Sequence, residues 1–193
     1  MATITAFENV SLDGVLQGPG RADEDTRGGF AHGGWASGYT DEVSMRFAGE
    51  SMSDTGAMLF GRRTYEDLLR FWTTTPEPNP FTEVLVHSPK FVVSRSGDVE
   101  LGYPNSVLLA GEATETVAAL KEQEELDLTV LGSGELVRAL HAARLIDAYV
   151  LQIHPVVLGS GTRLFGNTYI PLEVVHSVTT SSGIVVARLR VAQ

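Results

Sequence analysis

The sequence predicts a three-layer α/β protein, in which a mostly parallel central sheet is flanked by helices and ends in an antiparallel C-terminal hairpin. Strand-like and helix-like segments alternate along most of the chain, which favours a parallel sheet covered on both faces. Residues 148–153 are nearly all apolar, as expected of a strand buried on both faces. Two strand-like segments at the end flank the turn Ser181-Ser182-Gly183. We see no linker, so residues 1–193 are expected to form one domain, long enough for a sizeable core.

The strands are expected where short runs are rich in β-branched and other apolar residues. These runs are residues 3–10, 56–60, 90–94, 107–110, 128–131, 148–153, 173–180 and 184–191. In the last run Val185, Ala187 and Leu189 alternate with Arg188 and Arg190, which predicts that one face of this strand is solvated.

The helices are expected where apolar residues recur at helical spacing. They cover residues 40–53, 61–72, 81–87, 113–125 and 135–144. Ser37 or Thr40 is the expected N-cap of the first helix, because a hydroxyl can accept a hydrogen bond from a free N–H at a helix start. Val43, Phe47 and Met52 lie roughly on one side of that helix and are expected to face the core.

A long glycine-rich segment separates the first strand from the first helix. Residues 18–38 contain seven glycines. Loops of this length in compact domains are usually lids or binding loops. Phe30 and Trp35 within it either stack on a flat heterocycle or pin the loop to the core.

The composition excludes several kinds of partner and site. The chain has 24 acidic and 14 basic residues and a net charge of −10, which disfavours nucleic acid and anionic membranes. It has no cysteine, so disulfides, iron–sulfur clusters and thiol nucleophiles are excluded. The five histidines are scattered, and no metal site is expected. With no signal-peptide pattern and no apolar run near the roughly 20 residues of a membrane span, a soluble cytoplasmic protein is expected.

Three predicted strand ends carry residues suited to phosphate. Gly61-Arg62-Arg63-Thr64 opens a helix, whose free N–H groups and positive dipole end attract anions. Ser94-Arg95 offers a hydroxyl and a guanidinium for a 2′-phosphate, and Gly132-Ser133-Gly134 lets backbone approach a pyrophosphate closely. The last segment is no GxGxxG fingerprint, because position 137 is valine. Each segment alone also fits an ordinary turn or helix start, but together they indicate a dinucleotide site.

Five motifs, taken in order, carry a resemblance to a known family. They are Val10-Ser11-Leu12-Asp13-Gly14, Gly61-Arg62-Arg63-Thr64-Tyr65-Glu66, Pro89-Lys90-Phe91-Val92-Val93-Ser94-Arg95, Gly132-Ser133-Gly134-Glu135-Leu136 and His154-Pro155-Val156-Val157-Leu158-Gly159-Ser160-Gly161. Over nearly its whole length the chain resembles the dihydrofolate-reductase-like superfamily. Within it, the chain is similar to stand-alone proteins related to the C-terminal reductase domain of the bifunctional riboflavin-biosynthesis deaminase-reductase.

The resemblance implies a central sheet, NADPH as cofactor and frequent homodimers. It implies that the nicotinamide lies against the backbone near Asn9 and Val10, and that the adenosine 2′-phosphate lies near Ser94 and Arg95. The other cofactor-binding residues that it implies are Gly61, Arg62, Arg63, Thr64, Gly132, Ser133, Gly134, Glu135 and Leu136.

Two departures from the family patterns leave the substrate class open. The riboflavin-pathway reductases usually have a lysine before the Ser-Leu-Asp-Gly motif, where this chain has Phe7. The acidic residues of the first helix, Asp41, Glu42 and Glu50, match no folate-enzyme motif. Both a pterin-like substrate and a pyrimidine-like one, such as 5-amino-6-(5-phosphoribosylamino)uracil, therefore remain candidates.

The predicted activity is NADPH-dependent hydride transfer to a small heterocycle, which also requires a proton donor. Asp13, just beyond the first strand, is the candidate donor, although Asp-Gly after a strand is also an ordinary turn signal. Asn9, Trp35 and Tyr65 are the candidate substrate-binding residues, and core packing is the other interpretation of Tyr65. The alternative function is a non-catalytic dinucleotide- or small-ligand-binding protein on the same fold.

Overall fold

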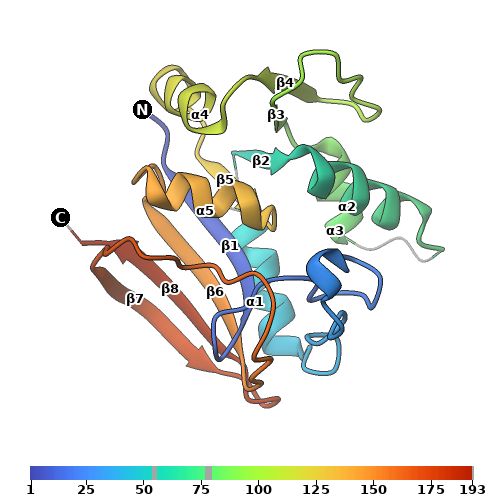
Figure 1. Ribbon diagram of the computed structural model, residues 1–193, viewed down its shortest axis with the longest axis vertical. Coiled ribbons are helices and arrows are strands. Elements are labelled where there is room, and N and C mark those ends of the chain that lie inside the picture. Colours follow the sequence, from blue (N-terminus) through green and yellow to red (C-terminus); the bar gives the residue numbers. More distant parts are fainter. Residues whose placement is uncertain (54–55, 77–79, 193) are drawn as a thin grey trace.

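The strands in the described part of the protein form one eight-stranded sheet in the order β4-β3-β2-β5-β1-β6-β8-β7 (Figure 1). The computed structural model describes residues 1–53, 56–76 and 80–192. The strands are β1 (Ile4–Ser11), β2 (Ala57–Gly61), β3 (Lys90–Ser94), β4 (Ser106–Ala110), β5 (Leu128–Leu131), β6 (Ala148–His154), β7 (Leu172–Thr179) and β8 (Val185–Val191). The helices are α1 (Glu42–Ser53), α2 (Arg62–Thr74), α3 (Pro80–His87), α4 (Ala113–Gln123) and α5 (Gly134–Ala142), with a single short turn η1 (Arg27–Gly29).

The sheet is parallel from β4 to β6 and antiparallel in its last two pairs. β1 pairs with β5 and β6, and β2 with β3 and β5, all in parallel. β8 runs antiparallel to both β6 and β7. The predicted fold class, including the C-terminal hairpin, is therefore confirmed. Parallel pairing brings the carboxyl ends of β1, β2, β3 and β5 to one edge of the sheet, where ligands bind in open α/β folds.

Helices cover both faces of the sheet, as the alternating pattern predicts. In Figure 1, α5 crosses the near face over β1 and β6, while α1 lies behind them. Leu136, Val137 and Leu140 of α5 pack with Ile4 and Ala6 of β1 in the larger core. Across the sheet, Tyr65 and Leu69 of α2 pack with Phe7 and Met58 in a second core. No helix in the described part of the chain has the length and apolarity that crossing a membrane requires.

The predicted solvated face of the last strand is solvated only at Arg190, which is exposed, because α1 covers the rest of that face. Phe47 of α1 forms a small core with Ile184 and Val186. The guanidinium carbon of Arg188 lies 5.8 Å from the centre of the Phe47 ring. The solvated strand is instead β7, the edge of the sheet, where Val174 is 65% exposed.

The N-cap of α1 is Asp41 rather than Ser37 or Thr40. Asp41 Oδ1 accepts a hydrogen bond from Ser44 N at 2.9 Å, and Ser44 Oγ accepts one from Asp41 N at 2.9 Å, which is a reciprocal capping arrangement. Asp41 Oδ2 also accepts a bond from Ser182 N at 3.0 Å, which ties α1 to the hairpin turn. Val43 and Phe47 face this core as predicted, and the side chain of Met52 lies outside the described part.

Candidate active site

The first turns of α2 and α5 lie together at the carboxyl ends of β2 and β5. Gly61 N donates a hydrogen bond to Ser133 Oγ at 3.0 Å. A Cβ atom on Gly132 would lie 3.3 Å from Thr64 Cγ2. The segments 61–64 and 132–136, which are far apart in the sequence, therefore form one surface where two positive helix-dipole ends and their free N–H groups converge.

The turn into α5 needs its glycines because the backbone there is both left-handed and crowded. Gly132 has φ of 58° and Ser133 has φ of 61°, a region that glycine enters most easily. At Gly134 a Cβ would lie 2.1 Å from Leu16 Cδ1. The glycine thus allows the segment after β1 to pack directly against the first turn of α5.

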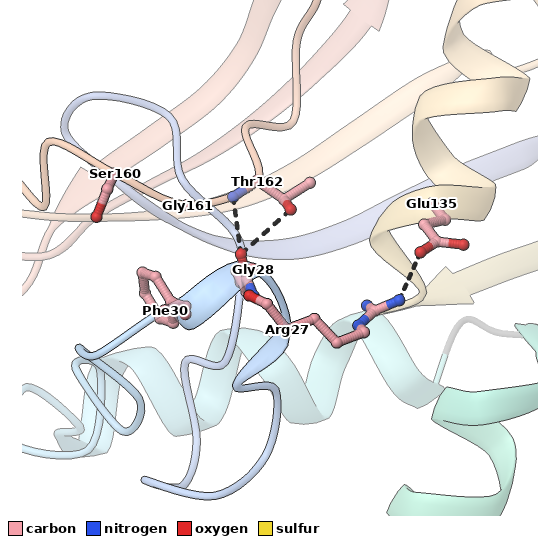
Figure 2. Close-up of a pocket in the computed structure, with 9 residues that line it drawn as sticks. Arg27, Gly28, Phe30, Glu135, Ser160, Gly161 and Thr162 are labelled. Atoms are coloured by element: carbon pink, nitrogen blue, oxygen red, sulfur yellow. Dashed lines mark hydrogen bonds and ion pairs between the residues drawn. The ribbon is translucent and has the colours of Figure 1, made fainter.

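Arginine side chains surround this surface, and one carboxylate lies between two of them. Glu135, in the first turn of α5, is 2.5 Å from Arg27 Nη1 and 3.6 Å from Arg63 Nη1. Figure 2 shows Arg27 reaching from the glycine-rich loop toward Glu135. Arg62 is paired with Glu66 on its own helix at 3.6 Å. The ion pair between Arg27 and Glu135 therefore fastens the loop to α5 at the predicted phosphate-binding surface.

A cavity of about 530 Å³ lies beside this ion pair. Its walls are residues 27–30 of the glycine-rich loop, Glu135 of α5 and residues 160–162 (Figure 2). The last wall is fixed by Gln17, whose Oε1 accepts bonds from Thr162 N at 3.0 Å and Thr162 Oγ1 at 3.2 Å. Gln17 and the 160–162 segment are not among the predicted site residues, because nothing in the sequence shows that they meet.

Ser94 and Arg95 continue the row of strand ends. Gly61, the last residue of β2, is in register with Val93, so Ser94 at the end of β3 and Arg95 just after it lie beside the start of α2. Ser94 Oγ accepts a bond from Ser96 N at 3.2 Å, and Arg95 is exposed. All three predicted phosphate-binding segments thus lie at the ends of the adjacent strands β3, β2 and β5.

Asn9 and Trp35, two predicted substrate-binding residues, meet around a buried histidine. His154 Nε2 is 3.0 Å from Asn9 Oδ1, and the rings of Trp35 and Tyr39 lie edge-on to His154 with centroid separations of 5.2 and 5.5 Å. Trp35 Nε1 also donates to Gln17 O at 2.8 Å, which holds the indole over the end of β1. Burial lowers the pKa of His154 to about 4, so its imidazole is neutral near pH 7.

Tyr65, the third predicted substrate-binding residue, belongs to the core. Its side chain is 1% exposed. The hydroxyl donates to Ser106 Oγ at 3.0 Å and accepts a bond from Tyr103 N at 3.2 Å. The structure therefore supports the packing interpretation of Tyr65 and does not bring it to Asn9 and Trp35.

Asp13, the predicted proton donor, fastens the segment after β6 to the turn after β1. Its carboxylate accepts bonds from Ser11 Oγ at 2.7 Å, Leu158 N at 3.1 Å and Gly159 N at 2.9 Å, and pairs with Arg163 Nη2 at 3.2 Å. These bonds, chiefly the one from the Ser11 hydroxyl, hold the pKa of Asp13 well below its usual range. Such a carboxylate has no proton to donate near neutral pH, so its contacts fit a structural role.

The sequence also predicts that the protein has no metal site. Among residues 1–53, 56–76 and 80–192, no three acidic, histidine or cysteine side chains gather in a way that could hold a metal ion.

Known proteins share this fold and sequence pattern. Protein YyaP of Bacillus subtilis, described as uncharacterized, is 30% identical over 139 residues, which are 69% of this chain and 73% of that protein. The crystal structure of a putative riboflavin biosynthesis protein from Shewanella sp. PV-4 is 21% identical over all of both chains, with a TM-score of 0.68. Dihydrofolate reductase from Enterococcus faecalis, complexed with NADP(H), is 13% identical over 99% of this chain and 97% of that one, with a TM-score of 0.61. The two structural likenesses confirm the dihydrofolate-reductase-like fold.

A family model that matches almost the whole sequence shows the family to which this chain belongs. The family model described as the RibD C-terminal domain matches residues 2–186. That match covers all the strands and helices around the candidate site except the last residues of β8. The chain therefore belongs to the RibD C-terminal domain family.

Proposed function

We propose that this protein is an NADPH-dependent reductase of a small, flat heterocycle. The observation that carries the proposal is the pairing of the α2 and α5 amino termini through Gly61 N and Ser133 Oγ. Two helix starts at one sheet edge form a natural cradle for phosphate groups. Membership of the RibD C-terminal domain family, and the likeness to an NADP(H)-bound dihydrofolate reductase, support a reductase-type role.

The side chains around the cradle fit a phosphorylated dinucleotide. Arg62, Arg63 and the 132–136 turn would hold the pyrophosphate, and Ser94 with Arg95 would hold the 2′-phosphate that distinguishes NADPH from NADH. Glu135 would contribute its backbone N–H, because its carboxylate is engaged by Arg27 and Arg63. When bound, NADPH supplies a hydride from its nicotinamide ring.

The substrate half of the site would be built from Asn9 and Trp35. Asn9 is partly exposed at the end of β1, and Trp35 is held beside it through His154 and the Gln17 carbonyl. An indole and an amide at one place suit a flat ring with polar edges, such as a pterin or a pyrimidine. The glycine-rich loop that carries Trp35 would then exclude water during transfer.

The alternative is a protein that binds a dinucleotide without catalysing a reaction. The ionised state of Asp13 is the observation that favours it, because the predicted acid has no proton to give. The test is to follow the absorbance of NADPH while pterins and pyrimidines are screened with the purified protein. Enzyme-dependent loss of NADPH with at least one heterocycle supports the reductase, whereas tight NADPH binding without oxidation by any of them supports the alternative.

We also propose that the protein acts as a homodimer, as the resemblance implies, and that it is cytoplasmic, as the sequence pattern predicts. The edge strand β7 would pair with the second copy of the chain, because it is exposed: Val174 is 65% and Val175 62% exposed. Measuring the solution mass tests this proposal, and a monomer at micromolar concentration contradicts it.

A further inference from the structure

Asn9 and His154 lie on the same face of the sheet, at the carboxyl ends of the adjacent strands β1 and β6. Side chains two positions apart in a strand share a face. Asn9 follows Phe7 by two positions, and His154 follows Val150 by four. Phe7 and Val150 both belong to the core that α2 covers. The two side chains therefore lie on the α2 side of the sheet, just beyond that core.

His154 is the buried member of this pair, and one of its ring nitrogens has no hydrogen-bond partner within the described residues. His154 is only 2% exposed, and the unpaired atom is Nδ1. The other nitrogen, Nε2, lies 3.0 Å from Asn9 Oδ1. Burial keeps the imidazole neutral near pH 7, because it lowers the pKa of His154 to about 4. A neutral imidazole carries one proton, which is on either Nδ1 or Nε2.

The surroundings of the His154 ring favour the proton on Nε2. A proton on Nδ1 would make that atom a buried donor without an acceptor, whereas without the proton the atom is only an unused acceptor. Buried N–H groups without a partner are rarer in proteins than unused acceptors. With the proton on Nε2, the histidine donates a hydrogen bond to Asn9 Oδ1, and this bond fixes which way the amide faces.

The same hydrogen bond turns the amino group of Asn9 away from the histidine. Asn9 Nδ2 makes no hydrogen bond within the described residues and, unlike His154 Nδ1, it is not shut off from solvent. It can therefore donate hydrogen bonds to a ligand. The rings of Trp35 and Tyr39, which lie edge-on to the imidazole, hold the histidine in place.

We propose that His154 is a positioning residue that holds Asn9 as a hydrogen-bond donor to the substrate, and that the substrate edge at Asn9 is a ring carbonyl. This inference rests on the proposed reductase function and narrows the chemical class of its heterocycle. A ring carbonyl accepts a bond from Asn9 Nδ2, whereas an exocyclic amino group at that place would set two donors against each other. The site is therefore expected to favour a ring with an oxo edge over the same ring with an amino edge.

Nitrogen NMR of the full-length protein with labelled histidine tests the hydrogen-bond arrangement without any ligand. The signals of His154 are those that are missing from the spectrum of His154→Gln. At pH 7 wild type is expected to show a neutral ring with its proton on Nε2. A proton on Nδ1, alone or together with one on Nε2, overturns the inference.

Binding of a matched pair of rings tests the specificity. Lumazine, which is a dioxopteridine, and diaminopteridine share one ring system, and NADP⁺ in place of NADPH prevents turnover. Lumazine is expected to bind the NADP⁺-loaded wild type about three- to tenfold more tightly, which is the effect of about one hydrogen bond. Asn9→Asp, whose carboxylate only accepts hydrogen bonds, is expected to reverse this preference. The same preference in Asn9→Asp as in wild type, or no binding of either ring to wild type, overturns the inference.

Two variants of His154 separate positioning from packing. His154→Gln keeps an N–H group that can donate to Asn9 Oδ1, and it is expected to keep the preference for lumazine. His154→Phe keeps an aromatic ring against Trp35 and Tyr39 but has no donor, so the Asn9 amide can turn and the preference is expected to vanish. Equal preferences in the two variants overturn the positioning role. Thermal unfolding checks that both variants are folded, and Asn9→Asp carries the test if His154→Phe is not.

The outcomes distinguish this inference from the proposed function. If wild type binds neither NADPH nor NADP⁺, the proposed function fails, and the ring preference fails with it. If NADP⁺ binds and wild type binds lumazine and diaminopteridine equally well, only the inference about His154 and Asn9 is overturned.

Discussion

The carboxylate of Glu135 lies 2.5 Å from the guanidinium of Arg27, although the two residues are 108 positions apart. This ion pair fastens the glycine-rich loop to the first turn of α5. Arg63, from the neighbouring helix start, is 3.6 Å from the same carboxylate. Glu135 therefore neutralises two arginines at the surface where cofactor phosphates are proposed to bind.

Removing this carboxylate is expected to strengthen NADPH binding and to loosen the loop. Exposed ion pairs are worth about 0–1 kcal/mol each, so Glu135→Gln is expected to raise NADPH affinity by about two- to fivefold. Hydrogen exchange of residues 25–30 is expected to speed up in the free variant. Glu173→Gln, which breaks the Glu173–Arg190 pair on the hairpin, is the control and is expected to change neither property. Weaker NADPH binding by Glu135→Gln would mean that the carboxylate itself helps to hold the cofactor.

Arg95, proposed to hold the 2′-phosphate, is expected to account for the preference for NADPH, whereas Arg62 would hold the pyrophosphate that both cofactors carry. A hydrogen bond to a charged group is worth about 1.5–3 kcal/mol, so replacing both residues with alanine is expected to weaken NADPH binding by about tenfold or more. NADH binding is expected to suffer less, because NADH has no 2′-phosphate. Arg46→Ala, on the exposed surface of α1, serves as the control. Equal losses for the two cofactors would contradict the placement of the 2′-phosphate.

Stability is expected to fall as pH drops through the window set by His154. Burial lowers the pKa of His154 from its ordinary 6.5 to about 4. Between these values the unfolded chain binds a proton that the folded protein does not, so stability is lost as pH falls below 6.5, by at most about 1.4 kcal/mol per pH unit. Denaturant unfolding at pH 6.5 and 4.5 measures the loss in wild type and in His154→Gln.

The difference between these two proteins isolates His154. The pKa shifts of Glu8 and His141 are present in both and cancel in the comparison. His154→Gln is expected to lose less stability than wild type over this pH range. The same loss in both proteins would show that His154 is not a buried, neutral group.

The glycine-rich loop is expected to depend on Gly33 for its packing. A Cβ at this position would lie 2.3 Å from the backbone oxygen of Ala22, whereas a Cβ at Gly38 would meet nothing within 4 Å. Gly33→Ala is expected to lower the free energy of unfolding by about 1–3 kcal/mol, as overpacking typically does. Gly38→Ala is expected to be neutral or slightly stabilising. Thermal unfolding of the pair distinguishes a packed loop from a merely flexible one, for which the two variants would behave alike.

The sheet and helices could be predicted because periodic apolar patterns are local properties of the sequence. Features that depend on distant contacts could not. Ser37, Thr40 and Asp41 are all suitable N-caps, and the contact with Ser182, 141 positions away, joins Asp41 to the hairpin turn. Asn9 meets His154 only because β1 and β6 are adjacent in the sheet.

The acidic residues near the first strand show the same limit of local patterns. Asp13 looks available in the sequence, but the N–H groups of Leu158 and Gly159, from the segment after β6, engage its carboxylate. Glu8 is one polar residue within a strand, and its burial becomes evident only in the folded protein.

Calorimetric titration of the purified protein with NADPH, and in parallel with NADH, is the most direct test of the proposed cofactor site. We expect micromolar binding of NADPH and much weaker binding of NADH, because the phosphate-binding segments at the ends of β2, β3 and β5 form one surface. Binding of neither cofactor would contradict the proposed function and leave the fold without an assigned ligand.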